Sequence, residues 1–288
     1  MTLLPAGPEP VLRFLRGQRN PDGGFRGRSR QSDLYYTVFA LDSLAALGGP
    51  CEPESLRAYL LGFGNGESLD FVHLACLARG WAALSADRLP LDARTRILDP
   101  IEAHRSADGG YNPVPQASHG TAYGCYLALG AYEDLRAQIP NPNGIGQCLR
   151  SLQSDDGGFS NEPVFPLAST PATAATLTVL RHLGETPDGA AVDWLLAQAD
   201  PQGGFRAMVA APIPDLLSAA TALHALAAAG VPLGPLQAPC LDFVLSLYTP
   251  PGAFRGSWLD DTPDCEYTYY ALLALGHLNE RESANRSP

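Results

Sequence analysis

The segment Gln153–Phe159, with the sequence QSDDGGF, is the clearest copy of a pattern that recurs along the chain. A polar turn, two glycines and an aromatic residue also occur at Gly23–Phe25, Gly109–Tyr111 and Gly203–Phe205, with a worn copy at Gly252–Phe254. The aromatic residues stand at positions 25, 111, 159, 205 and 254, so the steps are 86, 48, 46 and 49 residues. Because the first step is about twice the others, we expect a degenerate copy near 63–66. Such a period indicates an array of units that bury their apolar faces on one another.

Each unit is interpreted as two helices joined by the glycine-rich turn and a polar loop. The first helices are amphipathic, as Val11, Leu12 and Leu15 illustrate, whereas the second helices are apolar almost all round and must therefore be covered on every side. The predicted first helices are 9–18, 53–62, 91–105, 145–154, 189–199 and 236–248, and the predicted second helices are 34–47, 70–84, 120–135, 170–183, 216–229 and 265–278.

An open solenoid would need polar repeats at both ends, but the first and last repeats are as apolar as the others. The sequence therefore predicts an all-α, closed α/α toroid of about six helix pairs. The second helices would form the inner layer around a central apolar lumen, and residues 1–288 would form one domain with a polar tail over 279–288. Glycine allows the sharp turn between the layers, and the aromatic residue fills the gap between them.

The net charge and the cysteine pattern limit which partners and which cellular compartment we expect for the protein. The net charge of −11 and the isoelectric point of about 4.9 argue against nucleic acid or an anionic membrane as a partner. The six cysteines show no paired spacing and are interpreted as reduced thiols. The N-terminus lacks the features of a signal peptide, and no apolar run is long enough to span a bilayer. We therefore expect a cytoplasmic protein that is not an integral membrane protein.

This arrangement of repeats resembles the β subunits of protein prenyltransferases and the single barrels of squalene and terpenoid cyclases. The resemblance covers nearly the whole chain and implies an isoprenoid or other apolar ligand in the lumen. For an enzyme it implies a prenyltransferase or a class II terpene cyclase-like, proton-initiated reaction. Protein prenyltransferases also work with a helical α-type partner subunit, which the resemblance therefore suggests here.

The zinc ligands of protein prenyltransferases are only partly kept. Their Asp-x-Cys phrase corresponds to Asp215–Leu217, with leucine in the cysteine place, and their Asp-x-x-His-Thr phrase corresponds to Asp264–Thr268, with Tyr267 in the histidine place. Leucine cannot bind a metal, so we predict no metal ligands and no tightly bound zinc. A shifted site on Asp215, Cys265 and a neighbour is the alternative, and a prenyl diphosphate substrate would bring magnesium with it.

The same family grips its prenyl diphosphate with basic residues after a Gly-Gly-aromatic turn and with a His-Gly pair. Arg26, Arg28 and Arg30 resemble the first element, and His119 resembles the second, although both are displaced in repeat order. The arginines are interpreted either as a solvated loop or as a clamp for an anion, because guanidinium groups bind phosphate in a bidentate fork.

Class II cyclases protonate their substrate with the middle residue of Asp-x-Asp-Asp-Thr. Here Asp260, Asp261 and Thr262 match the last three places, and Trp258 stands in the first. We take Asp260, Asp261 and Asp264 as candidate proton donors, with Trp258 shaping the entrance. The competing interpretation is that Asp264 caps a helix and the other two are solvated.

Aligned by repeat, the starts of the inner helices form a polar column: Asp33, Asp70, His119, Ser169, Asp215 and Asp264. Capping explains such a column, but a ring would also gather it at the lumen opening. Of these residues, His119 and Asp215 are candidates for substrate binding, together with Tyr123 and Tyr267 as lumen walls. Two functions stay open, an isoprenoid-using enzyme and a non-catalytic binding or scaffold toroid. A carbohydrate-active toroid is disfavoured because the chain has only three tryptophans.

Overall fold

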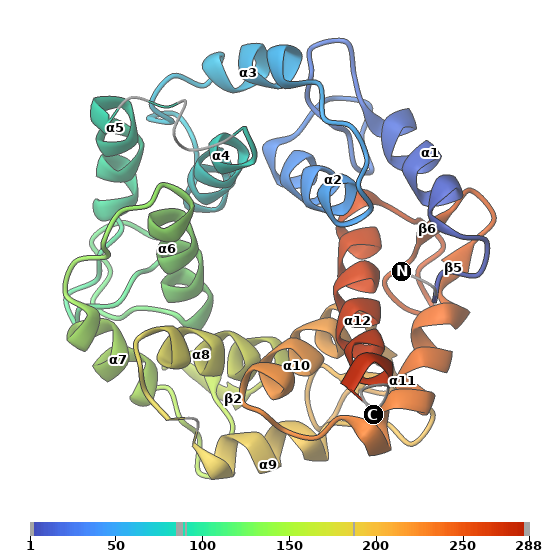
Figure 1. Cartoon of the computed structure of the whole chain (residues 1–288). Helices are drawn as coiled ribbons and strands as arrows, with labels where there is room; N and C mark the ends of the chain where they lie inside the picture. The colour runs from blue at the N-terminus through green and yellow to red at the C-terminus, as the bar shows by residue number, and fades with distance from the viewer. Residues whose placement is uncertain (1–2, 85–88, 90, 187, 285–288) are drawn as a thin grey trace.

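The computed structural model describes residues 3–84, 89, 91–186 and 188–284, and in this part of the chain twelve helices form two concentric rings (Figure 1). The inner ring consists of α2 (Leu34–Ala46), α4 (Phe71–Ala83), α6 (Ala122–Asp134), α8 (Thr170–His182), α10 (Leu216–Ala228) and α12 (Cys265–Ala284). The outer ring consists of α1 (Pro8–Gln18), α3 (Pro53–Leu61), α5 (Leu91–Glu102), α7 (Pro142–Arg150), α9 (Gly189–Ala197) and α11 (Gly234–Ser246). The predicted α/α toroid is confirmed.

The last inner helix differs from its predicted end. We expected a polar tail from residue 279, but α12 continues to Ala284. The segment that follows Leu278 contains Glu, Arg and Ala, which are good helix formers, so nothing in its composition ends the helix. The last four residues of the predicted tail, 285–288, lie outside the described residues.

Short antiparallel hairpins join some outer helices to the next inner helix. The strands pair as β1 (Ser160–Glu162) with β2 (Phe165–Ala168), β3 (Phe205–Arg206) with β4 (Pro214–Asp215), and β5 (Tyr248–Thr249) with β6 (Ala253–Phe254). The aromatic residue of each glycine-rich turn lies buried between the helix layers, as predicted: Phe25, Tyr111, Phe159, Phe205 and Phe254.

The glycine-rich turn is also the joint between neighbouring outer helices. The first glycine of each copy has a positive φ, and a Cβ there would touch the next outer helix: Gly23 meets Ser55 of α3, Gly109 meets Gly144 of α7, Gly157 meets Ala190 of α9, Gly203 meets Pro239 of α11, and Gly252 meets Pro10 of α1. The closest of these approaches would be 1.9 Å, from Gly203 to the carbonyl oxygen of Pro239. Glycine is therefore required by the close packing as well as by φ.

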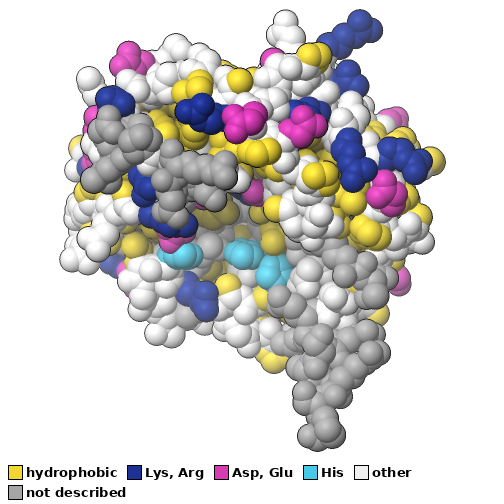
Figure 2. Space-filling model, turned by 45° about the horizontal axis from the view of Figure 1, so that its top comes forward, with side chains coloured by type: hydrophobic (Ala, Val, Ile, Leu, Met, Phe, Trp, Pro, Cys, Tyr) yellow, Lys and Arg dark blue, Asp and Glu magenta, His cyan; other side chains and the backbone are white. Residues whose placement is uncertain are grey.

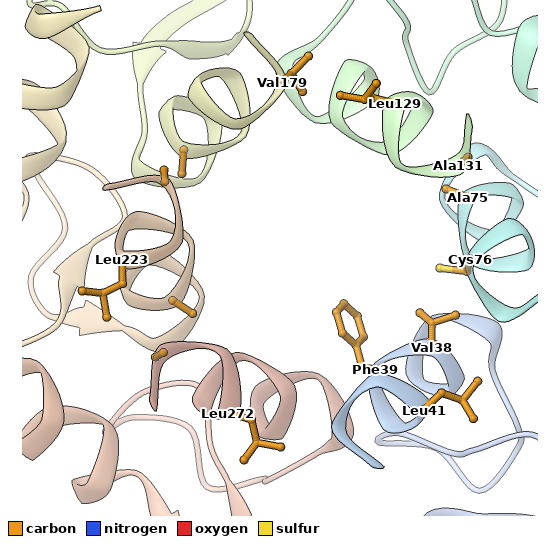
Figure 3. Packing of buried hydrophobic residues seen from close by; sticks show 14 of the residues in the cluster. Val38, Phe39, Leu41, Ala75, Cys76, Leu129, Ala131, Val179, Leu223 and Leu272 are labelled. Atoms are coloured by element: carbon orange, nitrogen blue, oxygen red, sulfur yellow. The ribbon is translucent and has the colours of Figure 1, made fainter. Parts of the chain in front are cut away.

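The contacts that close the ring are of the same kind as the contacts between consecutive repeats. The inner helix α12 packs against α10 on one side and against α2 on the other, and Gly252 after α11 packs on Pro10 of α1. The main apolar core lies between the two rings, whereas Phe39 of α2 points into the central opening (Figure 3). Because inner and outer helices alternate, all inner helices run in one direction, and their N-termini meet at one opening of the lumen.

Candidate functional site

The N-terminal opening of the lumen, which we call the mouth, is bordered by capped helix starts. At the start of each inner helix, a side-chain oxygen of the capping residue accepts a hydrogen bond from a backbone N–H of the first turn. The capping residues are Asp33, Asp70, Thr121, Ser169, Asp215 and Asp264. The capping interpretation is thus confirmed for five members of the predicted column. It is wrong for His119, because the chain enters α6 two residues later and Thr121 takes the cap.

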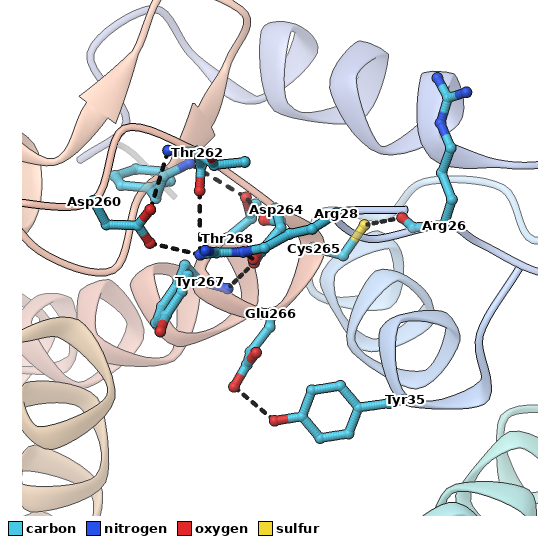
Figure 4. A network of polar contacts seen from close by, with 11 residues as sticks. Arg26, Arg28, Tyr35, Asp260, Thr262, Asp264, Cys265, Glu266, Tyr267 and Thr268 are labelled. Atoms are coloured by element: carbon cyan, nitrogen blue, oxygen red, sulfur yellow. Dashed lines mark hydrogen bonds and ion pairs between the residues drawn. The ribbon is translucent and has the colours of Figure 1, made fainter. Parts of the chain in front are cut away.

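An ion-pair cluster joins the first and last repeats at the mouth (Figure 4). Arg28 donates from Nε to Asp264 Oδ2 at 2.9 Å and from Nη2 to Asp260 Oδ2 at 2.5 Å. Its guanidinium also lies over the ring of Tyr267, 5.6 Å from the centroid. Arg28, which the sequence suggested as an anion ligand, therefore binds Asp260 and Asp264, which the sequence suggested as proton donors.

The three candidate acids of this loop have different surroundings. Burial raises the pKa of Asp264, whose side chain is 1% exposed, although the Tyr267 N–H and Arg28 favour its charged form. Burial alone would raise the pKa of Asp260 too, but the hydrogen bond and charge of Arg28, together with backbone N–H groups of the loop, outweigh it and hold that pKa below its usual value. The side chain of Asp261 is 97% exposed and has only a 3.8 Å contact with Arg255. Asp264 therefore retains a proton more readily than Asp260.

The other two arginines of the basic loop do not join Arg28. Arg26 binds Gln18 and the carbonyl of Gly17, and its guanidinium points away from the acidic cluster (Figure 4). Arg30 is exposed. The structure therefore brings one arginine of the predicted clamp to the mouth.

The remaining predicted binding residues lie around the mouth in different roles. The His119 side chain is 60% exposed, 3.7 Å from Asp108, and the Trp258 indole donates to Ser246 Oγ at 2.9 Å. Asp215 accepts from the N–H and the hydroxyl of Ser218, and burial raises its pKa. The backbone N–H of Tyr123 donates to Asn161 Oδ1 at 3.0 Å, and 39% of the Tyr123 surface is exposed.

A second carboxyl group, Glu266, was missed by sequence reasoning and faces the lumen. It accepts a hydrogen bond from the Tyr35 hydroxyl at 2.7 Å (Figure 4), and burial raises its pKa, with Asp264 adding to the effect. Glu266 on α12 also helps to raise the pKa of Tyr123 on α6, which burial raises most.

Aromatic side chains from three inner helices line the middle of the lumen. Phe39 of α2 stacks at an angle on Tyr269 and Tyr270 of α12, with ring centroids 5.2 and 5.6 Å apart. Tyr126 lies in the second turn of α6, and 43% of its surface is exposed. Since α6 is an inner helix, this exposure indicates open space beside an aromatic side chain.

Below the aromatic zone lies a polar layer that sequence reasoning also missed, formed by Asp42, Arg79 and Asp134. Arg79 of α4 forms an ion pair with Asp42 of α2 and lies over the rings of Phe39 and Tyr269 at 5.4 and 5.2 Å. Burial raises the pKa of Asp134 to about 6. A signal was available, because Asp42 and Arg79 each stand nine residues after the cap of their own helix.

Histidines border the C-terminal opening of the lumen. His224 of α10 and His277 of α12 lie with Nδ1 and Nε2 3.0 Å apart, and His182 of α8 pairs with Glu133. The surface view shows histidine side chains beside one another in a hollow (Figure 2). Burial and the neighbouring His277 lower the pKa of His224.

Among the described residues, other side chains stand at two places of the family's zinc ligand set at the mouth. Leu217 and Tyr267 occupy the places of a thiolate and an imidazole, and Asp215 is engaged with Ser218. Cys265 is fully buried, its sulfur lies 3.8 Å from the carbonyl of Arg26, and burial raises its pKa, so a shifted thiolate ligand is disfavoured. Among the described residues no group of three or more His, Cys, Asp or Glu could hold a metal ion.

The two rings of helices agree with the family to which the sequence is matched. The family model described as prenyltransferase alpha-alpha toroid domain matches residues 6–165 and 171–287. The chain therefore belongs to the prenyltransferase alpha-alpha toroid domain family. No curated protein matches the sequence. Within the described residues, no helix is long and apolar enough to cross a membrane.

Solved structures with the same fold have diverse activities. Protein geranylgeranyltransferase-I of Candida albicans, complexed with GGPP, is 15% identical with a TM-score of 0.75, covering 96% of this chain and 92% of that one. The type II terpene cyclase MstE from Scytonema is 16% identical with a TM-score of 0.67, covering 96% and 97%. An inactive α-1,6-mannanase variant from Salegentibacter, with α-1,6-mannotriose, is 13% identical with a TM-score of 0.63, covering 94% and 97%. At these identities the likeness shows the fold alone.

Proposed function

We propose that the protein binds an isoprenoid chain in its lumen and acts on it by a proton-initiated reaction, as a class II terpene cyclase does. The observation that carries this proposal is the Glu266 carboxyl, which accepts a hydrogen bond from the Tyr35 hydroxyl at 2.7 Å, while the Tyr35 ring lies 4.9 Å from the ring of Phe39 in the aromatic wall. A raised carboxyl pKa keeps a proton available, and aromatic faces stabilise the positive charge that protonation of an alkene creates.

The chemistry balances without a further reactant. The O–H bond of the carboxylic acid breaks as a terminal alkene carbon forms a C–H bond, which leaves a carboxylate and a tertiary carbocation. A neighbouring double bond attacks the cation and closes a ring, and a proton is finally lost to the carboxylate or to water. The product is an isomer of the substrate. The solved complex of MstE with geranylgeranyl dihydroxybenzoate, named as its substrate, gives the proposal a precedent in this fold.

Glu266 is the proposed proton donor, because burial raises the pKa of its carboxyl and like-charge repulsion from Asp264 adds to this effect. Asp260, Asp261 and Asp264 remain the alternatives from the sequence. A prenyl diphosphate would meet a mouth whose Arg28 is already paired with two carboxylates, so the geometry favours a substrate without diphosphate at that place.

The test is a turnover assay with C15 and C20 isoprenoids supplied as alcohols, diphosphates and prenylated benzoic acids. We expect a product of unchanged mass and altered retention, and Glu266→Gln should lower its rate by about 10²–10⁴. The matched control is Glu54→Gln on the exposed surface of α3, which should leave the rate unchanged. Release of diphosphate with the rate intact in Glu266→Gln would favour prenyl transfer instead.

A non-catalytic binding toroid is the second candidate, and one observation favours it. Asp264 caps α12 and forms an ion pair with Arg28, so a purely structural role accounts for this acid at the mouth. Tight binding of an isoprenoid without any product, in wild type and in Glu266→Gln alike, would establish this candidate.

A further inference from the structure

The polar layer of Asp42, Arg79 and Asp134 lies inside an otherwise aromatic lumen, and the proposed reaction does not use it. Arg79 is 31% exposed at its side chain, and Asp42 is 32% exposed, so both are open to the lumen space. Charged groups at such a depth are costly unless they are paired and hydrogen-bonded. The layer therefore needs a physical explanation.

The guanidinium of Arg79 is held in place, but not all of its N–H groups donate hydrogen bonds within the described part of the chain. Nη2 pairs with Asp42, while the faces of Phe39 and Tyr269 fix the plane of the guanidinium. Neither Nε nor Nη1 donates to any residue that the structure describes. A planar guanidinium with oriented, unused N–H groups is suited to bidentate binding of an oxyanion.

Asp134 gives the layer a second open position. Its carboxyl forms no hydrogen bond or ion pair with the described residues, although it is only partly exposed and senses the charges of both Arg79 and Asp42. Burial raises its pKa to about 6, so near neutral pH a fraction of the carboxyl is protonated and can donate to an oxygen. Arg79 thus offers N–H donors, and Asp134 on the neighbouring helix α6 adds a carboxyl group that interacts electrostatically with both Arg79 and Asp42.

We propose that this layer is a binding site for the carboxylate of an amphiphilic ligand whose apolar chain extends upward through the aromatic zone toward the mouth. Arg79 contacts the carboxylate through its free N–H groups while the faces of Phe39 and Tyr269 hold its plane, and the same two rings contact the first carbons of the chain. The site commits the ligand to a defined polarity, with its acidic end deep in the lumen and its apolar end at Glu266. This inference rests on the proposed binding of an isoprenoid in the lumen.

The experiment compares two probes with the same C15 chain, farnesoic acid and farnesol, by calorimetric titration at pH 7. Wild type should bind the acid about tenfold or more tightly than the alcohol, because charge-assisted hydrogen bonds form only with the acid. Arg79→Met should remove this preference and leave binding of farnesol nearly unchanged. The control Arg57→Met makes the same change on the exposed surface of α3 and should retain the preference.

A variant with the opposite effect protects the test against misfolding. Asp42→Asn removes the carboxylate that competes for Arg79, so farnesoic acid should bind more tightly than in wild type, which a damaged fold cannot mimic. Equal affinity for both probes in wild type overturns this inference and leaves lumen binding intact. A preference for the acid that survives Arg79→Met also overturns it. Failure of both probes to bind overturns the lumen function together with the inference.

Discussion

Arg28 and Asp264 lie 236 positions apart in the chain, yet Nε and Oδ2 are 2.9 Å apart. The contact exists because the ring closes, so that the first repeat becomes the neighbour of the last. It also fixes the state of the mouth, since one guanidinium compensates two carboxylates of the acidic loop.

Arg28→Ala should lower the free energy of unfolding by about 1–3 kcal/mol, because the Asp264 carboxylate would be left buried without its cation. The loss should be larger at pH 8 than at pH 5. Without Arg28 the pKa of folded Asp264 rises further above its unfolded value, and a raised carboxyl pKa costs stability as pH rises. Urea denaturation at both pH values measures this, with exposed Arg30→Ala as the control. Equal losses at both pH values would contradict it.

Asp260→Asn and Asp264→Asn should separate catalysis from structure. Asp264→Asn removes the buried partner of Arg28 and a charged helix cap, so it should lower the melting temperature whether or not the protein is an enzyme. If Glu266 is the acid, Asp260→Asn should change the rate less than about tenfold. A loss of 10²–10⁴ in Asp260→Asn with an intact melting temperature would return the role of acid to the DDT loop.

Asp134→Asn should stabilise the protein at pH 7.5 and have little effect at pH 4. Burial raises the pKa of folded Asp134 to about 6, above the value of an unfolded chain. The folded state therefore holds the proton more tightly, and the stability this gives at low pH is lost as pH rises through about 6. The gain should reach about 1–2 kcal/mol at pH 7.5 after allowance for partial exposure. Asp193→Asn, exposed on α9, is the control for the urea titrations.

Gly203→Ala should destabilise the protein by more than about 2 kcal/mol, because φ is +94° and the new Cβ would lie 1.9 Å from the carbonyl oxygen of Pro239. Gly17→Ala is the matched change in α1, where no atom lies within 4 Å of the new Cβ. That variant should be as stable as wild type or slightly more so. Thermal unfolding of the two proteins decides the matter, and similar melting temperatures would refute the account of the joint.

Elemental analysis of protein purified without chelators should find no near-stoichiometric zinc. The reason is the donor set, in which Leu217 cannot bind a metal and Cys265 is buried as a thiol. The same measurement on Leu217→Cys and Tyr267→His together asks whether the two absent ligands suffice to create a site. Zinc bound by wild type at one equivalent would reject this reading of the mouth.

Much of the fold could be predicted because the periodic turn leaves little freedom. The spacing of Phe159 and Phe205 sets the repeat, and an all-round apolar helix such as 170–183 has to lie inside. The functional site was harder to predict from the sequence because the inner helices are so uniformly apolar. A helix that is apolar on every face does not reveal which residues face the lumen, so Arg79 and Tyr269 could not be paired from sequence. The bond between Arg28 and Asp264 depends on ring closure, which brings distant repeats together.

The joint between Gly252 and Pro10 repeats the geometry of the joints within the chain, and Leu3 and Leu4 lie beside Leu275 and Gly276 of α12. Every helix pair in the ring therefore packs on two neighbouring pairs, including the pairs that come first and last in the sequence. Linking the two ends and opening the backbone between α6 and α7 should give a permuted gene whose product forms the same ring. Evolution has the same freedom, so a motif that shifts by several repeats along a sequence can keep its partners in space.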